Sequence, residues 1–199
     1  MPGNAEGADD AKRALRAELR ERRRIRTATQ REHDAAGLAA HLRELVERTG
    51  ARSLSAYLSL PDEPPTREFL AWATERGIRV LLPISREDGL LDWALYDGAD
   101  EILDAFGMPA PSTELLSPLA INDVDLMLVP AAAVDREGMR LGWGRGYFDK
   151  TLGSIEGCPP VYAVLFDGEL VDEVPRERHD MPVDGVVTPA GITTFSSVA

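Results

Sequence analysis

The sequence predicts an α/β fold, a single three-layer domain in which a mostly parallel central sheet is flanked by helices in a Rossmann-like arrangement. Three observations support this prediction. Apolar segments with the composition of strands alternate with segments in which apolar residues recur at helical spacing. The chain has 199 residues, of which 44% are hydrophobic, so it can bury one sizeable core. No repeat of fixed period and no interior linker divides it.

The chain is expected to begin with a tail and a polar helix. Residues 1–10 are small and polar, so we expect a disordered tail there, followed by a single domain over residues 11–195. Residues 11–26 are mainly alanine, leucine, arginine and glutamate without glycine or proline, a composition that favours helix. Only a thin apolar stripe, which includes Leu15 and Leu19, runs along this helix.

Two further helices have clearer signals at their ends. Thr27 or Thr29 is expected to cap a helix in which leucines recur at helical spacing and which ends at Gly50. Thr66 is expected to cap the next helix, which has one apolar face and ends at Gly77.

The expected strands are apolar runs bounded by turn residues. The most convincing central strand covers residues 124–129 and ends at Pro130, and the run over residues 78–84 is typical of a strand buried on both faces. Further strands are expected at residues 54–58, 90–96, 161–166 and 183–187. Residues 100–106 are expected to form a short helical or irregular piece.

Composition argues against several classes of function. A net charge of −12 argues against general affinity for nucleic acid, which depends on neutralising phosphates. The apolar runs are far shorter than the roughly 20 residues of a membrane span, and the first residues lack the apolar core of a secretory signal. Cys158 is the only cysteine, which suits a reducing compartment. We therefore expect a cytoplasmic monomer that binds neither nucleic acid nor membrane.

One region departs from this charge balance. Residues 11–31 include nine basic and two acidic residues, a local charge of +7 that leaves −19 for the rest of the chain. A solvated helix face is the expected environment for most of the arginines, including Arg20 and Arg22 to Arg24. The alternative is an RNA-binding module that uses this basic helix.

The strongest chemical signal is residues 140–150, RLGWGRGYFDK, which follow the expected strand at 124–129. Open α/β sheets bind ligands at the carboxyl ends of their strands, so this position favours a binding site. Glycines at every second position let backbone N–H groups approach an anion. Arg140 and Arg145 add permanent charge and forked donors that match phosphoryl oxygens. A helix that begins near Gly146 would add further donors.

Two familiar phosphate loops are excluded by inspection. The dinucleotide fingerprint needs G-x-G-x-x-G, a spacing that these glycines do not have. The P-loop needs glycine before its Lys-[Ser/Thr] pair, and Asp149 stands there instead. Asp149 is a hard oxygen ligand beside a basic loop, which suits Mg²⁺ bridging nucleotide phosphates. A plain helix cap is a compatible alternative for this carboxylate.

Residues 140–150 resemble the signature of the 5-formyltetrahydrofolate cyclo-ligase family, also called methenyltetrahydrofolate synthetase, which reads roughly R-L-G-x-G-x-G-Y-[YF]-D-[RK]. Three more segments in the right order extend the resemblance over most of the chain: residues 12–16, the loop at 58–66 and the closing motif at 174–188. The departures are small. Phe148 replaces a tyrosine that is common at its position in the family.

The resemblance implies an enzyme, with residues 11–195 as its catalytic domain. The implied reaction is the ATP- and Mg²⁺-dependent conversion of 5-formyltetrahydrofolate to 5,10-methenyltetrahydrofolate, with release of ADP and phosphate. The γ-phosphoryl group of ATP would move onto the formyl oxygen, and N10 of the folate would attack the resulting imidate carbon. A small-molecule kinase with the same loop is the alternative, because the composition of the loop indicates phosphate binding more directly than it indicates folate binding.

The resemblance also implies the site residues. Arg140 and Arg145 would be catalytic, and Asp149 and Asp184 would hold the metal. The residues implied for ATP are Lys12, Arg13, Arg16, Arg140, Leu141, Gly142, Gly144, Arg145, Gly146, Tyr147 and Asp149. Those implied for the folate are Leu58, Glu63, Gly144, Arg145, Gly146, Tyr147 and Phe148. Glu63 would accept hydrogen bonds from the amino and ring N–H groups of the pterin.

Overall fold

The computed structural model describes residues 3–155, 157–176 and 180–195. Its main sheet has the strand order β13-β12-β10-β7-β1-β2-β3-β6. The neighbouring strands β12, β10, β7, β1 and β2 are parallel, and β13, β3 and β6 are antiparallel to their neighbours. The strands are β1 (Ser53–Ser55), β2 (Arg79–Ser85), β3 (Leu91–Leu95), β6 (Leu115–Leu116), β7 (Leu126–Pro130), β10 (Val161–Val164), β12 (Gly185–Thr188) and β13 (Gly191–Thr194). The prediction of a mostly parallel sheet is confirmed.

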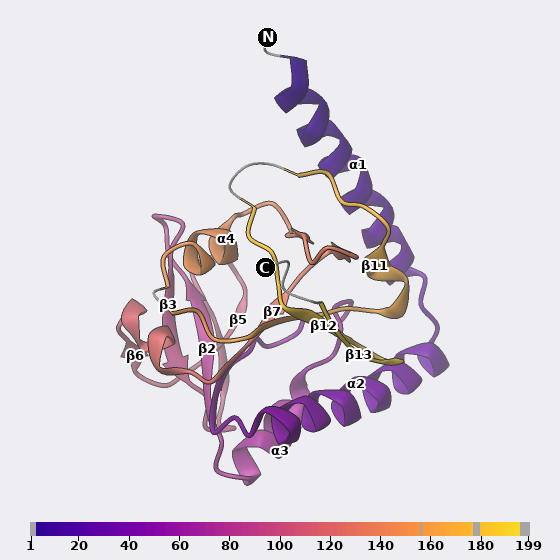
Figure 1. Ribbon diagram of the computed structural model, residues 1–199. Helices are drawn as coiled ribbons and strands as arrows, with labels where there is room; N and C mark the ends of the chain where they lie inside the picture. Colours follow the sequence, from indigo (N-terminus) through magenta and orange to yellow (C-terminus); the bar gives the residue numbers. More distant parts are fainter. Residues whose placement is uncertain (1–2, 156, 177–179, 196–199) are drawn as a thin grey trace.

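Each face of the sheet has its own apolar core. Side chains alternate along a strand, so Leu126 and Leu128 of β7 pack on one face, and Met127 and Val129 pack on the other. The elements that cover the first face are α2 (Ala28–Thr49) and α3 (Arg67–Glu75), and those on the second are α4 (Tyr147–Leu152) and the 3₁₀ helix η1 (Pro118–Asp123). Figure 1 shows α2 and α3 together, well apart from α4. The three predicted layers are therefore present.

The two helices on the first face begin in different ways. The Thr27 hydroxyl accepts a hydrogen bond from the N–H of Gln30, and the Gln30 side chain accepts one from the N–H of Thr27, which completes a capping box for α2. Gly50 ends α2 with a φ of 67°, which glycine adopts without strain. Of the two caps that the sequence offered, Thr27 is the one observed, and the predicted end at Gly50 is confirmed. Thr66 makes no cap hydrogen bond; its hydroxyl instead donates to the carbonyl of Tyr57.

The first helix, α1 (Gly3–Arg24), lies outside the three layers, and Figure 1 shows its first turns extending away from the sheet. The disordered tail expected over residues 1–10 is not what the structure shows for residues 3–10, which are helical. Asp9 and Asp10 form ion pairs with Arg13 one turn later, and such pairs stabilise a helix over this segment. No helix among the described residues is long and apolar enough to cross a membrane.

Short strands account for the main errors of the sequence reading. A hairpin of β4 (Glu101–Leu103) and β5 (Pro109–Pro111) replaces the helical or irregular piece that was expected. Asp104 accepts hydrogen bonds from two N–H groups of the turn, so local side-chain chemistry builds the hairpin. A small sheet was also missed: β8 (Ala133–Asp135), β9 (Arg140–Leu141) and β11 (Leu170–Val171), the last preceded by the 3₁₀ turn η2 (Asp167–Glu169). Such short strands carry no periodic pattern.

The parallel strands bring their carboxyl ends to one edge of the sheet. The chain leaves β1 just before Tyr57, leaves β2 at Ser85 and leaves β7 at Pro130, and these three residues line the same pocket. The crevice at this edge is where the sequence placed the binding site.

Candidate active site

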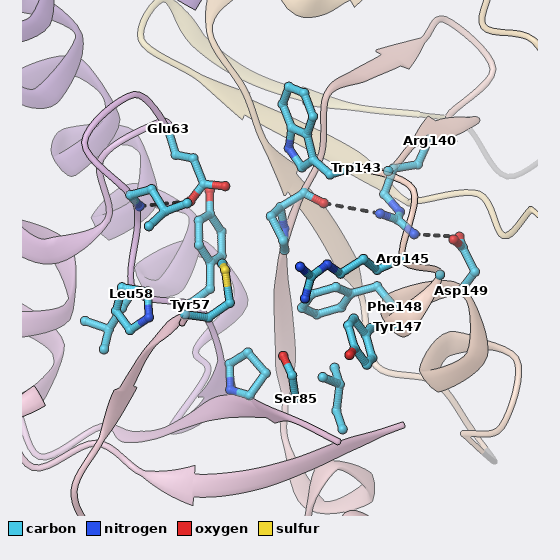
Figure 2. A pocket seen from close by; sticks show the side chains of 18 of the residues that line it. Tyr57, Leu58, Glu63, Ser85, Arg140, Trp143, Arg145, Tyr147, Phe148 and Asp149 are labelled. Carbon is cyan, nitrogen blue, oxygen red and sulfur yellow. Dashed lines mark hydrogen bonds and ion pairs between the residues drawn. The ribbon is translucent and has the colours of Figure 1, made fainter. Parts of the chain in front are cut away.

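A pocket of about 380 Å³ lies at the carboxyl ends of β1, β2 and β7. Figure 2 shows two facing groups of side chains, with Trp143 between them at one end. One group, called here the carboxylate wall, consists of Tyr57, Leu58 and Glu63. The other, called the arginine wall, consists of the remaining pocket residues of the loop 140–149, namely Arg140, Gly142, Arg145, Gly146, Tyr147, Phe148 and Asp149. The predicted glycine and arginine loop therefore does face the predicted folate loop.

The carboxylate wall is held by hydrogen bonds between side chains and backbone within residues 57–66. Thr66 Oγ1 donates to the carbonyl of Tyr57 at 2.6 Å, and the N–H of Thr66 donates to Ser59 Oγ at 3.2 Å. Glu63 Oε2 accepts the N–H of Leu60 at 2.9 Å. Burial raises the pKa of Glu63, and no basic side chain of the described residues forms an ion pair with its carboxylate. This wall thus presents a partly desolvated hydrogen-bond acceptor.

Arg140 anchors the arginine wall from beneath. Its guanidinium is buried, with Nη2 donating to Asp149 Oδ1 at 2.5 Å and Nη1 donating to the carbonyl of Pro130 at 3.2 Å (Figure 2). Its Nε has no hydrogen-bond partner among the described residues. Asp149 lines the pocket, and its side chain is 18% exposed. Arg140 therefore fixes the orientation of Asp149, and one of its own donors is left over.

The glycines let the loop pass close to other groups. Gly144 and Gly146 have φ angles of 99° and 69°, in the left-handed region that other residues rarely adopt. A β-carbon at position 142 would lie 3.1 Å from Arg140 Nη1. Arg16 of α1 lies against Gly144, and its Nε donates to the carbonyl of Gly142 at 2.7 Å. The first helix and the loop are therefore joined.

Arg145 is the exposed cation of the arginine wall. Its guanidinium lies 5.3 Å from the centre of the Phe106 ring, and no carboxylate of the described residues pairs with it. Tyr147 packs edge-on against the same ring at 6.3 Å and donates its hydroxyl to the carbonyl of Arg86 at 3.2 Å. The charge of Arg145 is thus supported by aromatic contacts and is free of a competing anion.

Comparison with known proteins agrees with this arrangement. A model of the 5-formyltetrahydrofolate cyclo-ligase family matches residues 8–189, most of the chain. The chain belongs to this family. A 5-formyltetrahydrofolate cyclo-ligase from Mycolicibacterium smegmatis is 37% identical over 184 residues, which cover 90% of this chain and 94% of that protein. A 5-formyltetrahydrofolate cyclo-ligase from Escherichia coli K12 is 27% identical over 180 residues, which cover 87% of this chain and 98% of that protein.

The fold is that of solved relatives. The structure of Aquifex aeolicus 5,10-methenyltetrahydrofolate synthetase superposes with a TM-score of 0.79 at 24% identity, covering 94% of each chain. The 5,10-methenyltetrahydrofolate synthetase of Mycoplasma pneumoniae gives a TM-score of 0.71 at 18% identity and covers 89% of this chain and 98% of that one. The Rossmann-like expectation therefore corresponds to the cyclo-ligase fold.

Most residues that the cyclo-ligase signature implies meet in the pocket. Those that line it are Leu58, Glu63, Arg140, Gly142, Arg145, Gly146, Tyr147, Phe148 and Asp149. Arg16 and Gly144 lie beside them through the contacts described above. Residues 177–179 of the closing motif lie outside the described residues.

Besides Arg16 and Gly144, three further residues predicted for ATP do not line the pocket. Lys12 is 4% exposed and forms an ion pair with Asp180 at 2.8 Å. The side chain of Arg13 is 71% exposed and pairs with acidic residues of its own helix, so it faces solvent. Leu141 is buried against Leu19 of α1. Leu141 and Lys12 therefore help to dock α1, and Arg13 has no role at the pocket in this structure.

The structure separates Asp184 from Asp149. Asp184 precedes β12, at the amino end of the parallel strands, and its Oδ2 accepts the N–H of Val161 at 2.7 Å at the start of β10. The pocket lies at the opposite, carboxyl edge, and Asp184 does not line it. The geometry therefore does not support the predicted metal role of Asp184, whose carboxylate instead joins the starts of two strands.

Sequence reasoning missed pocket residues that belong to α1. Arg20 and Arg23 were expected on a solvated face, yet both line the pocket, where their guanidinium groups lie 5.2 and 4.7 Å from the centre of the Trp143 ring. Arg23 is buried and donates to both oxygens of Glu169, at 2.6 and 2.9 Å. A signal was available, because Arg16, Arg20 and Arg23 recur at the spacing of one helix face.

The basic character of α1 is largely compensated. Arg22 and Arg24 are exposed, as expected, and pair with glutamates of their own helix. The other ion pairs of the basic segment join Lys12 to Asp180, Arg13 to Asp9 and Asp10, Arg23 to Glu169, and Arg26 to Asp34. Six of the nine cations of this segment therefore have an acidic partner among the described residues.

Among the described residues, no group of three or more His, Cys, Asp or Glu side chains is arranged to hold a metal ion. Asp149 is the carboxylate of the arginine wall, and only its Oδ1 is bonded to Arg140. Mg²⁺ that accompanies a nucleotide needs one or two protein carboxylates, because phosphates and water supply the other ligands. The residues present fit a magnesium ion brought by a nucleotide.

Proposed function

We propose that this chain converts 5-formyltetrahydrofolate to 5,10-methenyltetrahydrofolate with consumption of ATP and release of ADP and phosphate. The observation that carries the proposal is the facing of the two walls across one pocket. Glu63 offers an acceptor for a neutral heterocycle, and Arg145 offers an exposed cation that no carboxylate of the described residues pairs with. Membership of the cyclo-ligase family supports the choice of reaction.

The chemistry requires no protein nucleophile. A formamide oxygen is a poor leaving group, so the γ-phosphoryl group of ATP is first transferred to the formyl oxygen to give a phosphorylated imidate and ADP. N10 of the folate then attacks the activated carbon and loses its proton to solvent, the C–O bond breaks, and phosphate leaves with the former formyl oxygen. Catalysis of this kind consists of positioning and charge stabilisation.

The arginine wall supplies the groups for phosphoryl transfer. Arg145 is exposed at the pocket, and its fork of N–H donors matches the oxygens of a transferring phosphoryl group. Arg140 acts mainly through Asp149, which it holds by a 2.5 Å hydrogen bond. Mg²⁺ held by Asp149 would neutralise phosphate charge. Arg16, tied to the loop at Gly142, adds positive charge at the same end of the pocket.

The carboxylate wall supplies the groups for the pterin. Ionised Glu63 accepts hydrogen bonds from the pterin amino group and ring N–H, which lie side by side as donors. Leu58 offers an apolar contact, and Tyr147 and Phe148 lie across the pocket as aromatic surfaces (Figure 2). All these groups come from one chain, which supports a monomeric enzyme, and we place the reaction in the cytoplasm.

An absorbance assay tests the proposal directly. The protein is incubated with 5-formyltetrahydrofolate and Mg-ATP, and formation of the methenyl chromophore is followed, with ADP release measured in parallel. We expect both signals, in equal amounts, and neither when ATP is left out. ADP release with a phosphorylated product and no chromophore would instead identify a kinase.

A further inference from the structure

The hydroxyl group of Tyr57 has no assigned role, although it is buried in the carboxylate wall. Tyr57 is 5% exposed and lines the pocket, and its hydroxyl has no hydrogen-bond partner among the described residues. A buried polar group without a partner destabilises a protein, so such groups are rare outside functional sites. A phenylalanine ring would provide the same apolar packing. Packing alone therefore does not explain the hydroxyl.

We propose that the Tyr57 hydroxyl donates a hydrogen bond to the pterin ring of the bound folate, beside the carboxylate of Glu63. The inference rests on the proposed function, and it adds a binding group that the cyclo-ligase signature does not assign. Figure 2 shows Tyr57 and Glu63 on the same side of the pocket.

The two side chains complement different atoms of a pterin. The ring edge carries two neighbouring donors, the amino group and the ring N–H, and next to them a carbonyl acceptor. The carboxylate of Glu63 is an acceptor only, so it cannot pair with that carbonyl. A hydroxyl group beside the carboxylate supplies the missing donor. Burial and the nearby Glu63 raise the pKa of Tyr57 well above its ordinary value, so the hydroxyl keeps its proton.

The position of Tyr57 is set before substrate binds. Its carbonyl accepts from Thr66 Oγ1 at 2.6 Å, and Thr66 is also bonded to Ser59 through its backbone N–H. A hydroxyl held in place by the fold loses little conformational entropy when it forms a hydrogen bond to a ligand. The substrate thus satisfies a group that the free protein leaves unsatisfied.

Tyr57→Phe tests the proposal because it removes only the hydroxyl. We expect the KM for 5-formyltetrahydrofolate to rise about five- to tenfold, the loss of one hydrogen bond. The KM for ATP and kcat should stay within about twofold. The Tm should stay the same or rise, because an unsatisfied buried group has been removed.

Tyr162→Phe is the matched control. Tyr162 is also buried, but its hydroxyl is hydrogen-bonded to Thr194 Oγ1 at 2.9 Å, and it does not line the pocket. Its variant should show the opposite pattern, with a lower Tm and an unchanged folate KM. The contrast separates a binding role of a buried tyrosine from a structural one.

A folate KM in Tyr57→Phe within twofold of the parent value would overturn the proposal, as would a fall in Tm like that of Tyr162→Phe with folate binding intact.

Calorimetric titration of 5-formyltetrahydrofolate, without ATP, separates this inference from the proposed reaction. If the parent protein binds the folate and makes no methenyl product, weaker binding by Tyr57→Phe still supports the hydroxyl contact. If the parent protein binds no folate, both proposals fail.

Discussion

The two walls of the pocket are built on opposite principles. The carboxylate wall is a short loop whose backbone is tied by Thr66, and Glu63 within it is partly buried and has no ion pair among the described residues. The arginine wall relies on glycines in the left-handed region, and its buried cation, Arg140, is compensated by Asp149. Its other cation, Arg145, is exposed and uncompensated among the described residues.

The difference shows how one pocket can accept two unlike ligands. A partly desolvated carboxylate selects for hydrogen-bond donors on a neutral ring, because such donors offset the cost of its desolvation. An exposed arginine selects for anions and stays charged at any physiological pH. The pocket therefore has an acceptor end and a cationic end, and the reaction proposed here needs a folate at the first and a triphosphate at the second.

The largest effect is expected from Arg145→Ala. Removing the uncompensated cation from the arginine wall should lower kcat/KM for ATP by about 100- to 1000-fold, as for other groups that stabilise charge in a transition state. The Tm should not change, because Arg145 is exposed. Steady-state kinetics and thermal unfolding measure both. Arg136→Ala, at an exposed arginine paired with Asp172, is the control and should have normal activity. A loss of less than tenfold at Arg145 would contradict this role.

Asp149→Asn and Asp184→Asn should differ in their need for magnesium. Asparagine at 149 keeps an oxygen for Arg140 and removes the charge, so activity should fall about 10- to 100-fold and recover partly at high Mg²⁺. Asparagine at 184 should leave the magnesium dependence unchanged, because that residue lies at the opposite edge of the sheet. Titrating Mg²⁺ at fixed ATP distinguishes them, and a shift seen only for Asp184→Asn would reverse the assignment.

Glu63→Gln should act on the folate alone. The KM for 5-formyltetrahydrofolate should rise about tenfold, because the amide replaces one acceptor oxygen of the carboxylate with an NH2 group, which cannot accept a hydrogen bond from the pterin. The KM for ATP should stay the same. The variant should be at least as stable as the parent protein at neutral pH, since it has no buried charge to desolvate. An equal rise in both KM values would mean that the two walls are not separate.

A smaller effect is expected on α1. Arg16→Ala removes the hydrogen bond to the carbonyl of Gly142, so the KM for ATP should rise about three- to fivefold. Arg13→Ala, on the same helix, should have no effect on that KM, because its side chain is 71% exposed and faces solvent. Equal KM values for the two variants would show that α1 does not support the arginine wall.

The smallest effect is a difference in how stability depends on pH. The pKa of Glu63 is raised in the folded protein, so the folded state holds this proton to higher pH than the unfolded state does. The contribution of Glu63 to stability is therefore largest at low pH and decreases as pH rises through the raised pKa. The Tm of Glu63→Gln should match that of the parent at acid pH and equal or exceed it by a few degrees at neutral pH. If the Tm of the parent protein increased relative to that of Glu63→Gln as pH rose, the predicted direction of the pH dependence would be wrong.

Local chemistry made part of the fold and the site predictable. Thr27 and Gly50 bound α2 through contacts with residues a few positions away; the sequence identified Gly50 and narrowed the cap to Thr27 or Thr29. The glycine and arginine loop was recognised because its glycines, arginines and carboxylate all lie within the continuous segment of residues 140–150. The hairpin at β4 and β5 was missed because strands of three residues have no period to detect.

Other features depend on contacts between distant parts of the chain. The burial of Arg23 requires Glu169, 146 residues away in sequence.

The position of Asp184 did carry a signal in the sequence, since a residue at the start of a parallel strand lies at the amino edge of the sheet, away from the ligand crevice. The resemblance to the family outweighed that signal.

By itself, the sequence determined the order of the longer helices and strands, the layered sheet and the position of the glycine and arginine loop, because these follow from propensity, periodicity and side-chain chemistry over short stretches. Only the tertiary structure decided which charges reach the pocket and which are neutralised elsewhere. Desolvation and ion pairing depend on what packs around a group in space. For this reason the fold partly desolvates the Glu63 carboxylate and buries the Tyr57 hydroxyl, whereas the side chain of Arg13 remains in solvent.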